Sequence, residues 1–157
     1  MENEKIAALL YDLAGINLER ARAYEEASFQ NQLFDVELRT TFALLANQSR
    51  QNMYMLNLYV EKLLARAHAP RPGYGALYKN WKNSAAYFAG ENRREMLLSC
   101  DAGEKAMITL YGQSCELPPK AELREMLQNQ LRGFESSLAT IKKMLEVTSK
   151  VNQRGVI

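Results

Sequence analysis

The feature that most constrains the fold of this chain is a helical pattern that occurs twice. The segment LLYDLAGINLERARAY carries Asn17 seven residues before Tyr24, and the segment MLLSCDAGEKAMITLY carries Glu104 seven residues before Tyr111. Seven residues are close to two turns of an α-helix, so the two residues of each pair share one face. Two helix pairs in tandem predict an all-α four-helix bundle with a polar residue at matched inner positions.

The prolines divide the chain into long stretches with helical periodicity, because they occur only at positions 70, 72, 118 and 119. Between them, apolar residues recur every three or four positions, which is typical of amphipathic helices. We therefore expect four helices, the first with Asn3 as its N-cap. They cover residues 3–28, 33–67, 92–114 and the stretch from the CELPPK turn to about Lys150.

The connections between these helices have unequal lengths. FQNQ and CELPPK are short turns, whereas residues 68–91 form a long break that contains GALYKNWKNSAAYF, which predicts a short extra helix lying across the bundle. Two short turns and one long crossover match a ferritin-like antiparallel bundle. The alternative is a simple up-down bundle with an elaborated middle loop. Residues 1–150 are expected to form one domain, followed by a tail over 151–157.

Composition and charge exclude several classes of function. Lys and Arg are scattered among Asp and Glu, the net charge is only +2, and no basic stripe suggests contact with nucleic acid. No apolar run approaches the ~18 residues of a transmembrane helix. The acidic start MENEKIAALL does not resemble a secretory signal. Cys100 and Cys115 fit a reduced compartment, so we expect a cytoplasmic protein.

The inner layer is poor in metal ligands. Di-iron bundles take a Glu from the first helix of each half and a Glu-x-x-His from the second. The NQ-x-R sequence shared by residues 47–50 and 129–132 indicates which positions correspond. They are Asn17, Ser49 and Asn52 in the first half, and Glu104, Leu131 and Phe134 in the second. One of these six is a carboxylate and none is a histidine.

Two interpretations of this layer remain open. In one, Glu104 with Asn17, Asn52 and Ser49 nearby holds a single iron or manganese ion in a degenerate site. In the other, the layer is structural, and its polar groups bond to one another. Its members would be Asn17, Tyr24, Ser49, Asn52, Glu104 and Tyr111. Two amides are weak metal ligands, which favours the structural interpretation with no cofactor. A register error of one turn would bring Asp101 or Glu135 inward.

Three motifs resemble a bacterial ferritin-like four-helix-bundle family of unknown function, itself similar to rubrerythrins and bacterioferritins. They are I-x-N…Y-x-x-A over Ile16–Ala27, G-x-x-x-K-x-W over Gly75–Trp81, and C-D-x-G-E…Y over Cys100–Tyr111. The resemblance implies the fold and carries over no activity. Asp101 stands where the family usually has glutamate, and Glu135 stands near where some relatives place histidine. Both departures weaken an inherited metal site.

We expect from these features a non-enzymatic structural or interaction protein that forms a homodimer. The dimer rests on the aromatic crossover and on apolar residues outside the inner stripes, namely Met53, Met55 and Leu58. A residual metalloprotein and a small-molecule-binding bundle are the alternatives. A stress-related role follows only by analogy with ferritin-like proteins.

Overall fold

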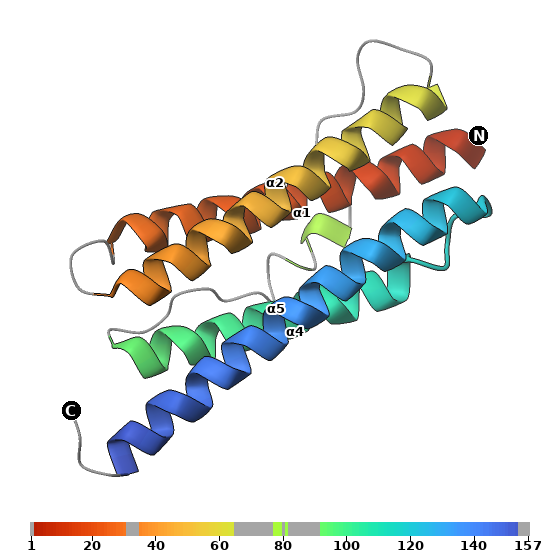
Figure 1. Ribbon diagram of the computed structural model, residues 1–157. Coiled ribbons are helices and arrows are strands. Elements are labelled where there is room, and N and C mark those ends of the chain that lie inside the picture. The colour runs from red at the N-terminus through yellow and green to blue at the C-terminus, as the bar shows by residue number, and fades with distance from the viewer. Residues whose placement is uncertain (1, 31–34, 65–76, 80, 82–91, 154–157) are drawn as a thin grey trace. The chain divides into compact units, whose positions relative to one another are not determined.

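The computed structural model describes residues 2–30, 35–64, 77–79, 81 and 92–153. Its long elements are all α-helices, which confirms the all-α class. They are α1 (Glu2–Gln30), α2 (Val36–Leu64), α4 (Arg93–Ser114) and α5 (Ala121–Gln153). The chain divides into two compact units, Met1–Asn83 and Ser84–Ile157, each built on one pair of long helices (Figure 1).

The first unit is an antiparallel hairpin of α1 and α2. Near one end, the Asn3 side chain donates to the Leu63 carbonyl at 3.5 Å. Near the other end, Ser28 Oγ donates to the Arg39 carbonyl at 3.0 Å. The large buried apolar side chains recur every three or four residues. They include Ile6, Leu10, Leu13, Ile16, Tyr24, Leu38, Phe42, Leu56 and Val60.

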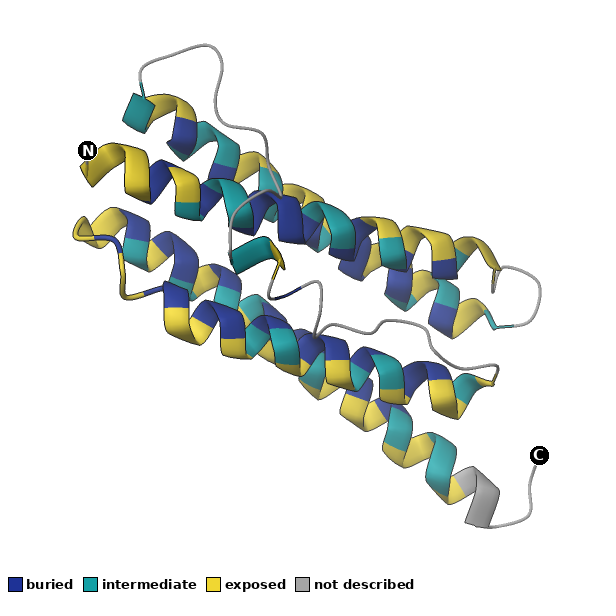
Figure 2. Ribbon diagram, turned by 180° about the vertical axis from the view of Figure 1, so that it is seen from behind, coloured by how far each residue is buried: buried dark blue, intermediate teal, exposed yellow. Residues whose placement is uncertain are grey.

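The second unit is an antiparallel hairpin of α4 and α5. Near the turn, Gln128 Nε2 donates to Glu116 Oε1 at 2.8 Å, and toward the open end Arg93 Nε donates to Thr148 Oγ1 at 3.1 Å. Each helix presents one buried and one exposed side along most of its length (Figure 2). The buried apolar side chains include Leu97, Cys100, Met107, Tyr111, Leu123, Leu127, Phe134 and Ile141.

The helix starts differ in how well the sequence predicted them. The predicted start at residue 92 is correct for α4, where Asn92 is the N-cap and its side chain accepts the Glu95 amide at 2.9 Å. Asp35 accepts the Leu38 amide at 3.0 Å at the start of α2. The N-cap role of Asn3 was wrong, since Asn3 lies inside α1 and bonds to α2. The helix α5 extends to Gln153, three residues beyond its predicted end.

Only part of the predicted crossover helix is described. Leu77–Lys79 and Trp81 are helical, the Trp81 side chain is buried, and the Tyr78 and Trp81 rings lie 6.4 Å apart between centroids. His68 and the rest of the crossover lie outside the described residues. None of the described helices combines the length and the apolar character that crossing a membrane requires.

The sequence spacing predicts an inner stripe on α5 of Leu127, Leu131, Phe134, Leu138, Ile141 and Leu145. Leu127, Phe134 and Ile141 are fully buried as predicted. Leu131, Leu138 and Leu145 are half-buried, whereas Gln130 and Ser137 are buried. The face is therefore rotated by about one residue from the predicted stripe. The leucines lie at its border, where they are partly covered, and polar side chains occupy part of its centre.

Candidate functional site

In the α1–α2 hairpin, the three residues predicted as ligand-equivalent positions come together. Ser49 Oγ donates to Asn17 Oδ1 at 2.9 Å, and Asn52 Nδ2 donates to the same oxygen at 3.3 Å. Asn17 also donates its amide to the Leu13 carbonyl at 2.9 Å. Asn17 and Ser49 are fully buried and Asn52 is half-buried. The three ligand-equivalent positions of the first half are thus adjacent in the structure.

Sequence reasoning missed Arg20, which belongs to the same polar layer. Its side chain is fully buried, and Nη1 donates to Ser49 Oγ at 2.7 Å and to the Leu45 carbonyl at 3.0 Å. The guanidinium carbon lies 5.1 Å from the centroid of the Tyr24 ring, which is cation–π distance. A signal for this placement was present, because position 20 lies three residues after Asn17 and four before Tyr24, on the inner face.

In the α4–α5 hairpin, a tyrosine and a glutamine form the main polar contact. The Tyr111 hydroxyl donates to Gln130 Oε1 at 2.6 Å, and both side chains are buried. The Phe134 ring meets Tyr111 edge-on, with 4.9 Å between centroids. In the first hairpin the Tyr24 ring similarly contacts Phe42, at 5.4 Å. Each repeated tyrosine is therefore a core ring packed on a phenylalanine of the partner helix.

The second predicted half-site does not assemble around Glu104. Glu104 is fully buried as expected, but Gln130 and Phe134 lie at the level of Tyr111, about two turns along α4. In an antiparallel pair, seven residues back along α4 correspond to seven forward along α5. The bonds Tyr111–Gln130 and Arg93–Thr148 thus place Ser137 at the level of Glu104. The assignment of Leu131 and Phe134 as partners of Glu104 was wrong.

The two alternative acidic residues do not reach the inner layer. Asp101 Oδ2 pairs with Lys105 Nζ at 2.7 Å on the flank of α4. Glu135 is exposed on α5. Within the described part of the chain, no three His, Cys, Asp or Glu side chains gather closely enough to hold a metal ion. The donors at the ligand-equivalent positions therefore do not fit a di-iron centre.

The two cysteines are buried free thiols in the second unit. Burial raises the pKa of the Cys115 thiol, and the neighbouring Glu116 carboxylate raises it further. A raised pKa lowers the thiolate fraction at neutral pH, and the thiolate is the nucleophile. Cys115 is thus a poor candidate for a reactive site.

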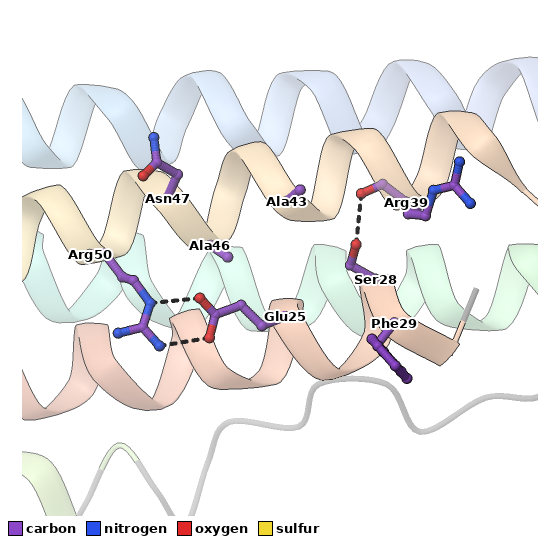
Figure 3. Close-up of a pocket in the computed structure, with 8 residues that line it drawn as sticks. All are labelled: Glu25, Ser28, Phe29, Arg39, Ala43, Ala46, Asn47 and Arg50. Atoms are coloured by element: carbon purple, nitrogen blue, oxygen red, sulfur yellow. Dashed lines mark hydrogen bonds and ion pairs between the residues drawn. The ribbon is translucent and has the colours of Figure 1, made fainter. Parts of the chain in front are cut away.

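A separate depression of about 300 Å³ is lined by residues of both α1 and α2 (Figure 3). Arg50 Nε and Nη2 donate to the two carboxylate oxygens of Glu25 at 2.6 and 2.7 Å beside it. This ion pair lowers the pKa of Glu25, chiefly through the hydrogen bonds from Arg50. The lining residues are Glu25, Ser28, Phe29, Arg39, Ala43, Ala46, Asn47 and Arg50.

Comparisons of the chain with protein-family models, with curated proteins and with solved structures gave no match.

Proposed function

We propose that this chain is a cytoplasmic, non-enzymatic interaction protein, built as a ferritin-like four-helix bundle with a long crossover and with no metal cofactor. One observation carries the absence of a cofactor. The side chains at the ligand-equivalent positions of α1–α2 are bonded to one another, as Ser49 and Asn52 both donate to Asn17. A metal ion would have to displace these bonds and would gain neutral amides and a hydroxyl as ligands.

The metal content of the untagged protein tests this proposal directly. The protein would be purified without chelator from cells supplied with iron, manganese and zinc. We expect no metal in stoichiometric amount. Stoichiometric metal that is lost in Glu104→Ala and retained in Glu125→Ala, an exposed carboxylate of the same unit, would instead support the residual metalloprotein and overturn the proposal.

The bundle itself is tested by the cooperativity of unfolding. Trp81, the only tryptophan, reports on the first unit by fluorescence, and the thiols of Cys100 and Cys115 report on the second by their accessibility to a labelling reagent. One domain predicts that both probes change at the same urea concentration. Two distinct midpoints would show that the hairpins unfold independently and would contradict the single bundle.

An uncharged stripe on α2 supports the homodimer. Leu44 and Met55 are 65% and 40% exposed, and they are eleven residues apart, close to three helical turns. Gln48, Gln51 and Leu58 lie on the same side between or just beyond them. A symmetric dimer brings the same surface of two copies together, so charges on that surface would tend to meet like charges. This stripe carries no formal charge and therefore avoids that repulsion.

Sedimentation or light scattering measures the dimer. We expect the wild-type protein to be dimeric and the double variant Leu44→Glu/Met55→Glu to be monomeric at the same concentration. Leu98→Glu is the matched control, because Leu98 is a 43% exposed leucine on α4, in the other unit, and should leave the dimer intact. A wild-type protein that stays monomeric at high concentration would contradict the homodimer.

The depression beside Glu25 and Arg50 supports a second candidate function, the binding of a small molecule. Its volume of about 300 Å³ lies at the lower end of the range for ligand pockets. Ala43 and Ala46 provide small walls, and the Phe29 ring beside them is 72% exposed. A screen of small aromatic compounds for a rise in melting temperature tests this function. Ala43→Leu should abolish such a rise by filling the space, and a rise that persists would place binding elsewhere.

A further inference from the structure

The most unusual group in the α1–α2 hairpin is a cation that cannot be neutralised. The Arg20 side chain has no exposed surface, and arginine keeps its charge under all conditions in which proteins fold. A buried charge is costly unless its surroundings compensate for the lost hydration. The groups around Arg20 must therefore be arranged to stabilise a positive charge.

The hydrogen bonds around Arg20 show how the oxygens of the layer are arranged toward this charge. Arg20 Nη1 donates to the Ser49 hydroxyl and to the Leu45 carbonyl, at 2.7 and 3.0 Å. The Ser49 hydroxyl in turn donates a hydrogen bond to Asn17 Oδ1 at 2.9 Å. The Tyr24 ring presents its π-system to the guanidinium at 5.1 Å. Each of these groups turns its electron-rich side to the cation or is polarised by it.

The cation lies beside the residues that the repeated sequence pattern aligns with the ligand positions of a di-iron bundle. Ser49, aligned with a carboxylate of the second helix, is bonded directly to Arg20. Asn17, aligned with the first-helix carboxylate, is one hydrogen bond further away. A divalent ion held by these oxygens would lie within a few ångströms of a permanent positive charge, and at low dielectric that repulsion is strong.

We propose that the Arg20 guanidinium is the built-in cation of this polar layer and takes the electrostatic role that a metal ion has in di-iron bundles. This inference rests on the metal-free function proposed above and explains why the layer would bind no metal ion. The layer needs one positive charge to organise its oxygens, and the chain supplies that charge covalently.

A pair of variants with similar volume and different charge tests this role in the full chain. Arg20→Lys keeps a positive charge, and Arg20→Met keeps the length and loses the charge. We expect Arg20→Lys to melt at a higher temperature than Arg20→Met, with both below the wild type. If Arg20→Met is as stable as Arg20→Lys, or more stable, the layer does not need a cation and the proposal is wrong.

Rescue of the melting temperature by added guanidinium is a second test, because a side chain that only fills space would not require a cation. Arg20→Ala leaves a guanidinium-sized gap, and low millimolar guanidinium should raise its melting temperature saturably. Sodium chloride at equal ionic strength and urea, which is planar but neutral, should not. The control Arg22→Ala removes a largely exposed arginine of the same helix, with a 64% exposed side chain, and should show no rescue. Equal effects of urea and guanidinium on Arg20→Ala would overturn the proposal.

Both tests are made on metal-depleted protein, which separates this inference from the proposed function. Stoichiometric metal in wild-type protein would overturn the metal-free function without affecting the comparison of lysine with methionine. A failure of that comparison would remove the role of Arg20 and leave the metal analysis as it stands.

Discussion

The two helical hairpins share sequence motifs but fill their interiors differently. In α1–α2, a chain of hydrogen bonds joins Arg20, Ser49, Asn17 and Asn52 across the two helices. In α4–α5, a hydrogen bond between two neutral side chains, from Tyr111 to Gln130, joins the helices at the core. The first hairpin therefore joins its helices through a connected polar network. In the second, the tyrosine that bonds across the helices also packs its ring on Phe134.

The difference arises from where the repeated motifs meet across each hairpin. In the first hairpin, the residue after NQ is Ser49, and it lies opposite Asn17. In the second, Gln130 of the NQ motif lies opposite Tyr111. Tyr111 follows Glu104, the position equivalent to Asn17, by seven residues. The second-helix motif is thus displaced by about two turns between the halves. The motif is also turned by one residue, because Ser49 is buried and Gln48 half-buried in the first half, whereas Gln130 is buried and Leu131 half-buried in the second.

The formal charge of the buried residues also differs. Arg20, a basic residue, is fully buried in the first hairpin, and Glu104, an acidic residue, is fully buried in the second. The repeat therefore does not conserve a metal site in either half. It conserves the buried tyrosine, which in both halves packs against a phenylalanine of the partner helix.

The largest expected effect comes from removing these phenylalanine rings. Phe134→Ala should lower the free energy of unfolding by about 3–5 kcal/mol, because it deletes a fully buried ring and leaves a cavity beside Tyr111. Phe42→Ala should cost about the same in the first hairpin. Urea denaturation followed by circular dichroism measures both values. A much smaller cost for Phe42→Ala would show that the two tyrosine–phenylalanine contacts are not equivalent.

A smaller effect should distinguish the network from the isolated hydroxyls. Ser49→Ala removes the acceptor of Arg20 and the donor to Asn17, and should cost about 1–3 kcal/mol. Ser114→Ala is the matched control, since its buried hydroxyl bonds to the Leu110 carbonyl of its own helix at 2.8 Å. That change should be nearly neutral. Equal costs for the two serines would mean that the network adds nothing beyond an ordinary buried hydroxyl.

The helices could be predicted from the sequence because their signals are local. Apolar residues at steps of three and four mark the inner faces, and Asn92 marks the start of α4 by its capping bond. The inner face of α5 was predicted one residue out of place. The spacing predicts Leu131, Leu138 and Leu145 inside, but these leucines are only half-buried at the border of the face. Gln130 and Ser137 lie inside instead, because long apolar side chains can be partly covered from the border.

The candidate site could be predicted where helical spacing and the repeated motif both marked a residue as inward-facing. Asn17 and Ser49 were correctly placed inside, whereas Arg20 was omitted because a charged residue on an inner face is rare. The level of Glu104 was also missed. Sequence similarity between helices cannot fix their axial offset, which depends on how the ridges of one helix pack into the grooves of the other.

The polar contact of the second hairpin should be worth less than the network of the first. Tyr111→Phe removes the donor to Gln130 and keeps the ring that packs on Phe134. A net loss of about 1 kcal/mol is expected for one neutral hydrogen bond. Tyr54→Phe, at a 63% exposed tyrosine, is the control and should change almost nothing. A loss from Tyr111→Phe larger than that from Ser49→Ala would reverse the comparison between the hairpins.

The smallest effect should come from the ion pair on the outside of the first hairpin. Arg50 lowers the pKa of Glu25, so folding favours the ionised carboxylate. Such a group stabilises the fold above its unfolded pKa, and the contribution is lost as the pH falls through the lowered folded pKa.

Because the side chains of Arg50 and Glu25 are 42% and 43% exposed, solvent screening should limit the effect to less than about 1 kcal/mol. Wild type should therefore melt slightly above Glu25→Gln at neutral pH and lose that advantage as the pH falls through the lowered pKa of Glu25. An advantage that persists in acid would come from packing of the side chain and not from its charge. Exposed pairs of this kind cannot replace a buried network, which is why the interior of α1–α2, and not its surface, should dominate the difference between the two hairpins.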